Sequence, residues 1–216
     1  MWQPVHARAW RQAAGITPAA HRAASSHARP LGAVVAPCLA EPLAVLIARL
    51  RGSFPPVEAC LAADKDGCGG PGAAAAAAAA AARPTAGGAS ALSLVRRPRL
   101  LICGPEGAGQ GHLAAALLHA LEGLPIHAIG LPSLLADAGA RSLEEALVHA
   151  FVEARRAAPA LLFLPHLPLW WATAPAALRA ALLMLVEDLP PEFPLLLVAV
   201  ADAPAGEVDP EASFPV

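Results

Sequence analysis

The feature that most constrains the fold is the stretch RLLICGPEGAGQGHLAAALLHAL at residues 99–121. An apolar segment typical of a strand leads into a glycine-rich turn, and an Ala/Leu run typical of a helix follows. Gly104 and Gly109 have the spacing of a P-loop, in which backbone N–H groups surround a phosphate at a helix N-terminus. This strand-to-helix context, more than the glycine spacing itself, favours a P-loop-derived turn over an ordinary one.

The side chains that give such a loop its chemistry are missing. Gln110 stands where a Lys would reach the β- and γ-phosphates, and Gly111 stands where a Ser or Thr would bind Mg²⁺. His112 is the nearest substitute, and a histidine is mostly neutral at pH 7. We expect no cofactor and no metal, with ATP and Mg²⁺ bound only if residual affinity survives. The predicted degenerate nucleotide loop comprises Gly104, Gly107, Gly109, Gln110, Gly111 and His112.

Two further strand ends also lack the residues that an active P-loop ATPase carries there. The apolar segment 160–164 ends in Pro165 and His166, where a P-loop ATPase carries its acid pair. His166 is conceivable as a base, but the sequence favours a capping or packing role. The segment 195–200 leads to Asp202, where an AAA+ enzyme presents a polar sensor Asn; the alternative is a turn-forming Asp. Alteration of three sites on separate strands is what loss of hydrolysis predicts.

Strand-like and helix-like segments alternate from residue 99 to 200. Strands are expected at 99–103, 126–130, 160–164 and 195–200, and helices at 111–122, 142–157 and 175–188. Unbroken apolar strands between helices predict a parallel sheet covered on both faces, which is a truncated αβα P-loop core. Trp170 and Trp171 follow the third strand, and we favour core packing for them over a role as inter-subunit anchors.

The N-terminal half is organised differently. Residues 1–63 form a basic, largely disordered segment with one helix, expected from Leu43 to Arg51 between Pro42 and Gly52. Residues 64–94 form a Gly/Ala-rich low-complexity linker. The predicted αβα core then occupies residues 95–216.

Charge and composition exclude several classes of protein. Residues 1–99 carry eleven Lys/Arg against four Asp/Glu, a net charge of +7, whereas residues 100–216 carry four against thirteen, a net charge of −9. The acidic half argues against direct DNA binding by that half, and the basic half has scattered arginines without the aromatic interleaving that would support nucleic-acid contact. The uncharged stretch 157–178 contains four prolines, which would break a membrane-spanning helix. Four cysteines without a C-x-x-C pair predict neither a zinc site nor a disulfide framework.

Three segments together resemble a known family. They are RPRLLICGPEGAGQGHLAAALLHALE, LPSL at 131–134 and FVEARRAAPALLFLPHLPLWW at 151–171. They are similar to the second AAA+ module of the ATPase family AAA domain-containing protein 2/2B family. Residues 16–55 resemble the segment that joins the two AAA+ modules of that family.

The resemblance implies a nuclear, chromatin-associated protein with a bromodomain. In that family the first module hydrolyses ATP and drives a hexamer that acts on histones, and the second is degenerate and structural. By this resemblance Gly104 to Gly111 form the inactive loop, and Pro165 and His166 replace the acid pair. The first module, arginine finger, lid and bromodomain have no counterpart here, so the chain is expected to be a fragment.

The expected function is that of a non-hydrolysing structural module in a nuclear hexameric ATPase that binds or remodels histones and regulates transcription. Its partners would be other AAA+ modules of the same protein and, through the parent protein, histones, without nucleic-acid or membrane contact. One alternative is an active P-loop ATPase in which His112 or His166 compensates. Four arginines without an acid before Glu41 resemble a mitochondrial transit peptide and would place that enzyme in mitochondria. Another alternative is a truncation product that does not fold.

Overall fold

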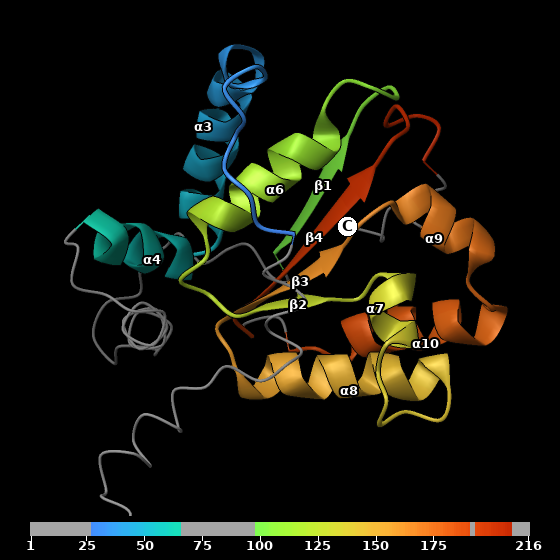
Figure 1. Ribbon diagram of the computed structural model, residues 1–216. Helices are drawn as coiled ribbons and strands as arrows, with labels where there is room; N and C mark the ends of the chain where they lie inside the picture. The colour runs from blue at the N-terminus through green and yellow to red at the C-terminus, as the bar shows by residue number, and fades with distance from the viewer. Residues whose placement is uncertain (1–26, 66–97, 191–192, 209–216) are drawn as a thin grey trace, which may run out of the picture.

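The protein folds into three layers, in which a parallel sheet lies between two layers of helices (Figure 1). The computed structural model describes residues 27–65, 98–190 and 193–208. The four strands pair in the order β1-β4-β3-β2, and every pairing is parallel. The strands are β1 (Arg99–Cys103), β2 (Ile126–Ala128), β3 (Ala160–Leu164) and β4 (Leu195–Ala201). The predicted α/β core with a parallel sheet is confirmed.

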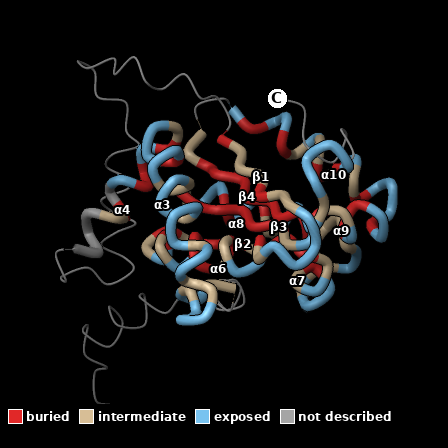
Figure 2. Tube along the Cα trace, turned by 90° about the horizontal axis from the view of Figure 1, so that it is seen from above, coloured by how far each residue is buried: buried red, intermediate tan, exposed pale blue. Residues whose placement is uncertain are grey.

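The two central strands, β3 and β4, are buried on both faces, and this explains why their sequences are apolar without alternation. Every residue of β3 and β4 is buried, and Figure 2 shows both strands at the centre of the molecule. Successive side chains of a strand point to opposite faces. Leu162 and Leu164 of β3 therefore join one hydrophobic cluster, and Leu161 and Phe163 join the other. The sheet separates two cores, each closed by helices.

Helices cover both faces of the sheet. One core contains residues of α7 (Leu131–Leu135), α8 (Leu143–Arg156), α9 (Leu167–Thr173) and α10 (Ala176–Glu187). The other contains residues of α3 (Ala36–Ser53), α4 (Pro56–Lys65) and α6 (Gln110–Ala120). Within the described ranges, none of these helices is long and apolar enough to cross a membrane.

The prediction for the N-terminal segment was wrong in two respects. Helix α3 begins at Ala36, seven residues before the predicted start, and α4 was not predicted at all. Pro37 lies in the first turn of α3, where a missing N–H costs nothing, and Pro42 is accommodated inside the helix. Helix α3 contacts α6, and buried residues of α3 and α4 belong to the same hydrophobic cluster as residues of α6, so the expectation of disorder is corrected for residues 27–65. Residues 1–26 and most of the predicted linker lie outside the described residues.

Two short helices, α7 and α9, were also missed. Each has a proline at its first or second position, Pro132 in α7 and Pro168 in α9. Pro168 is one of the four prolines of residues 157–178 that are expected from the sequence to break a helix. At the start of a helix, however, proline is favoured because its fixed φ already suits the first turn.

Candidate functional site

The glycine-rich turn leads from the carboxyl end of β1 into α6, as the sequence predicts (Figure 1). Gly107 and Gly109 have φ values of +82° and +92°, and Gly109 is the N-cap of α6. Residues with a Cβ rarely adopt this left-handed conformation, so the turn requires glycine at both positions. The N–H of Ala108 donates to the carbonyl of Pro105 at 3.1 Å.

Gln110 fills the inside of this loop with its own side chain. It is 5% exposed, and its Nε2 donates to the carbonyl of Pro105 at 2.7 Å. A Cβ added to Gly104 would lie 3.0 Å from the same Nε2. The amide therefore occupies the space between the two ends of the loop and satisfies its donor there. Gly111 and His112, the next two residues, are exposed.

A side chain from a distant part of the sequence covers the other end of the loop. A Cβ added to Gly109 would lie 3.2 Å from Cδ1 of Leu39, a residue of α3. Helix α3 lies alongside α6 (Figure 1), and the two helices are in contact. The start of α6, where a phosphate would bind in an active P-loop, is thus flanked by an apolar side chain.

The predicted acid-pair and sensor positions lie next to the loop. His166 follows β3 and Asp202 follows β4, and His166 Nδ1 lies 2.9 Å from Asp202 Oδ2. The N–H of Gly104 donates to the carbonyl of Ala203 at 3.1 Å, which ties the loop to the end of β4. The carboxyl ends of β1, β3 and β4 therefore bring all three altered sites to one edge of the sheet.

His166 differs from its expected role. It occupies the N-cap position of α9, but its side chain makes no capping hydrogen bond and is 66% exposed. Its φ of +49° lies in the left-handed region, which is uncommon for a residue other than glycine. The expectation of a capping or packing side chain was wrong, because the ring faces solvent and contacts Asp202. Pro165 packs near Gly130, where an added Cβ would lie 3.0 Å from its Cγ.

Trp170 and Trp171 belong to the core. They are 2% and 6% exposed and join the hydrophobic cluster of α8 and α10. The guanidinium carbon of Arg179 lies 5.7 Å from the ring centroid of Trp171. The favoured interpretation, core packing, is confirmed, and the alternative of interface anchors is wrong, since neither indole is available on the surface of this chain.

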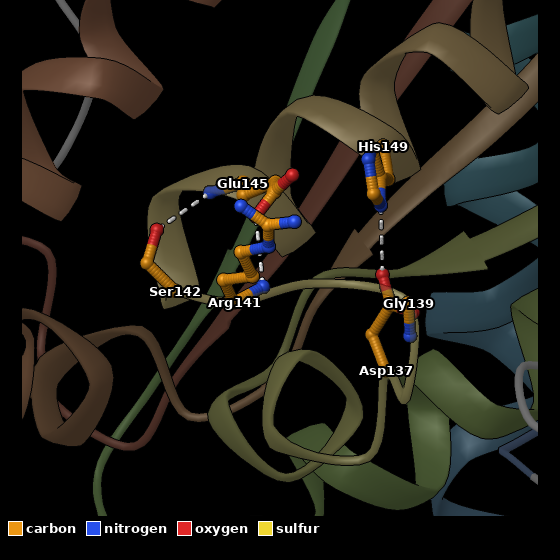
Figure 3. A network of polar contacts seen from close by, with 6 residues as sticks. All are labelled: Asp137, Gly139, Arg141, Ser142, Glu145 and His149. Carbon is orange, nitrogen blue, oxygen red and sulfur yellow. Dashed lines mark hydrogen bonds and ion pairs between the residues drawn. The ribbon is translucent and has the colours of Figure 1, made fainter.

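A second polar region, formed by the loop that follows α7 and by α8, was not found from the sequence (Figure 3). Asp137 Oδ2 lies 3.2 Å from His149 Nδ1, and the N–H of Gly139 donates to Asp137 Oδ1 at 2.9 Å. The Gly139 N–H, and then His149, lower the pKa of Asp137 below its ordinary value. These residues are twelve positions apart at most, but no spacing rule connects a loop Asp with a helical His.

The start of α8 joins the same region. Ser142 Oγ accepts from the N–H of Glu145 at 3.2 Å, and Glu145 Oε2 accepts from the N–H of Arg141 at 2.8 Å (Figure 3). This arrangement is close to a capping box, and the Ser-x-x-Glu spacing could have predicted it. In the ranges that the structure describes, no three His, Cys, Asp or Glu residues are grouped so that they could hold a metal ion.

Comparison with known proteins shows which proteins the chain is related to. No protein-family model matches it. The ATPase family AAA domain-containing protein At1g05910 of Arabidopsis thaliana is 42% identical over 199 residues, 92% of this chain. The chain is homologous to the ATPase family AAA domain-containing proteins. Human ATPase family AAA domain-containing protein 2B is 39% identical over 53% of the chain, and the yeast ATPase histone chaperone YTA7 is 36% identical over 52%.

These AAA domain relatives are much longer than the matching region. The chain spans 15% of the length of the Arabidopsis relative and 8% of each of the other two. The family resemblance predicted from the loop and strand motifs is thereby confirmed.

Proposed function

We propose that the chain is a non-hydrolysing structural module of a chromatin-associated AAA ATPase that handles histones. The observation that carries this proposal is the position of Gln110, buried inside the loop and bonded to Pro105. In an active loop that space belongs to phosphate oxygens held by N–H groups and a lysine. Here a neutral amide of the protein occupies it, and no cation of the loop faces the site.

The packing of α3 supports the same function. Leu39 lies against Gly109 at the first turn of α6, so the N-terminal segment reinforces the closed loop. An apolar side chain at this place would have to move before a triphosphate with its Mg²⁺ could approach, since burying an unpaired charge against it is unfavourable. The loop then serves to join β1 to α6 and to hold α3.

The relatives support the biological setting. YTA7 is named an ATPase histone chaperone, and the chain shares 36% identity with it. We extend this to a role in histone handling, in the nucleus, with the module packing against other AAA+ modules of the same protein in a hexameric ring. Hydrolysis would come from another module, and histones would be engaged through the assembled protein.

An ATPase assay combined with light scattering tests this function. The purified chain should show no ATP turnover above a buffer blank. A longer version that includes an active AAA module should form a ring, and deletion of residues 95–216 from it should abolish assembly while leaving the other module folded. Unchanged ring formation after the deletion would refute the structural role.

One observation favours an active ATPase as the second candidate. His166 Nδ1 and Asp202 Oδ2, 2.9 Å apart at the edge of the sheet next to the loop, have the geometry of a base oriented by a carboxylate. If this pair activated water, the chain would hydrolyse Mg-ATP, and His166→Ala and Asp202→Asn would each remove that turnover.

A further inference from the structure

A cavity of about 460 Å³ opens beside β2, at the opposite end of the sheet order from β1. It lies between β2, α7, the loop that follows α7, and α8. Its volume falls within the range of roughly 300–1,000 Å³ that is usual for sites that bind small groups. Neither the glycine-rich loop nor the His166–Asp202 pair contributes to its walls.

Small apolar residues create the space. Ala128 of β2 and Ala146 and Ala150 of α8 line the cavity, and their methyl groups leave room that a larger residue would fill. His127, which is 3% exposed, also lines it. This part of the wall suits an aliphatic chain, because contact with methyl groups removes apolar surface from water.

The polar wall is held in place before any ligand arrives. Asp137 is fixed by the Gly139 N–H at 2.9 Å and by His149 at 3.2 Å (Figure 3). Because an ionised carboxylate only accepts hydrogen bonds, Nδ1 of His149 carries the proton of this contact. The Ser142–Glu145 contact fixes the start of α8, next to the loop that bears Asp137. A prearranged wall reduces the ordering cost of binding.

The charge of the lining selects the sign of a ligand. Two carboxylates, Asp137 and Glu153, line the cavity, and none of the lining residues is Lys or Arg. Asp137 is ionised at neutral pH, as an ordinary carboxyl would be, and the Gly139 N–H and His149 lower its pKa further. An anionic ligand would be repelled here, whereas a cation would find carboxylate partners in a lining that is otherwise mostly apolar.

We propose that this cavity binds the cationic side chain of a basic peptide, with its methylene stem against the alanine wall and its charged end at Asp137 and Glu153. The site goes beyond the proposed structural role, since it uses neither the loop nor ring assembly. A basic peptide is favoured over a free polyamine because most of the lining is apolar, and such a wall suits the methylene stem of one side chain better than a second ammonium group.

Amide chemical shifts of the isotope-labelled chain test this proposal. The probes are Nα-acetyl-lysine methylamide, which keeps its side-chain ammonium group, the corresponding norleucine compound, which lacks that charge, and spermidine. The lysine probe should shift the amides of residues 127–128, 133–139 and 146–153 in a saturable manner. It should bind about fivefold more tightly than the norleucine probe, and raised salt should weaken it, because the pairs are near the surface. Equal affinity of lysine and norleucine probes, or tighter binding of spermidine, would overturn the proposal.

Two variants locate the binding site. Glu153→Gln should weaken the lysine probe about threefold, which is the size expected for one exposed charge pair. Glu144→Gln is the matched control, because Glu144 lies on the same helix but does not line the cavity, and it should leave affinity unchanged.

Ala150→Leu should fill the cavity and abolish binding of both amino-acid probes. If Ala150→Leu unfolds, Glu153→Gln alone decides: affinity equal to that of the wild type refutes the site. Nucleotide binding at the loop would leave all these results unchanged, so the two proposals fail separately.

Discussion

Glutamine and lysine differ in one property that decides what the turn after β1 can do. A neutral amide can be buried when its donors are satisfied, whereas a buried ammonium needs an anion beside it. Gln110 is 5% exposed and donates to Pro105 at 2.7 Å, so its burial is compatible with a loop that has no bound phosphate. With a lysine at this position the loop would need the nucleotide to complete it.

The contribution of this amide to stability can be measured. Gln110→Ala removes the bond to Pro105 and leaves the carbonyl without this donor, so the free energy of unfolding should fall by about 1–2 kcal/mol. Urea denaturation followed by circular dichroism provides the value. His112→Ala, at an exposed position of the same first turn, should change stability by less than about 0.5 kcal/mol. Equal effects of both substitutions would show that Gln110 does not hold the loop.

The two glycines around Gln110 should respond to alanine in opposite directions. Gly109→Ala places a Cβ at a φ of +92° and 3.2 Å from Leu39, so it should destabilise by at least about 1 kcal/mol. Gly111→Ala adds a methyl group in open space inside a helix and should stabilise by about 0.5–1 kcal/mol. Thermal melts of the two variants give the comparison. The same sign for both would contradict the described backbone of the loop.

Asp137 should confer a pH dependence. Its pKa is lowered in the folded state by the Gly139 N–H and by His149, so folding favours the ionised form. The resulting stability is present above the unfolded pKa of about 4 and is lost as the pH falls through the lower folded pKa. The difference in unfolding free energy between the wild type and Asp137→Asn should therefore shrink below about pH 4. A difference that stays constant from neutral to acid pH would show that the carboxylate is not the cause.

At the scale of elements, the sequence was most informative for the sheet. The predicted ranges of β1 and β3 agree with the structure, because both strands are apolar runs bounded by polar or proline residues. Helices α8 and α10 differ from prediction by one residue at each end. The short helices α7 and α9 were missed, since their five and seven residues are too few to show a helical period.

The candidate site was predictable to a similar extent. The carboxyl ends of parallel strands share one edge of a sheet, so the meeting of the loop, His166 and Asp202 followed from the strand assignments. Contact of Leu39 with Gly109 could not be predicted, because residues 66–97 separate α3 and α4 from the core and no sequence period links the two parts. The cavity beside β2 likewise arises from tertiary packing of small residues.

The N-terminal helices should be part of the folded unit. Leu50 is 4% exposed and belongs to the hydrophobic cluster that α6 shares with the sheet. Leu50→Ala should reduce the free energy of unfolding by about 2–5 kcal/mol, as expected for a buried leucine. Val45→Ala, on the same helix but 47% exposed, should cost less than about 1 kcal/mol. If Leu50→Ala were as mild, residues 36–65 would not be packed on the core as described.

At the scale of the whole molecule, the two ends of the sheet differ in structure. At the β1 end, Gln110 and Leu39 close a loop whose frame is that of a nucleotide site. At the β2 end, a cavity with two carboxylates remains open. A module built in this way would contribute surfaces to an AAA assembly without using nucleotide itself.

Titration of Mg-ATP into the purified chain by calorimetry is the most direct test of this account. The closed loop predicts no saturable heat at millimolar nucleotide, and no rise in melting temperature, since a ligand that binds only the folded state must stabilise it. Leu39→Ala, which uncovers the loop without adding a charge, should give the same result. Saturable one-to-one binding that raises the melting temperature of the wild type would contradict the central claim that this loop no longer serves nucleotide.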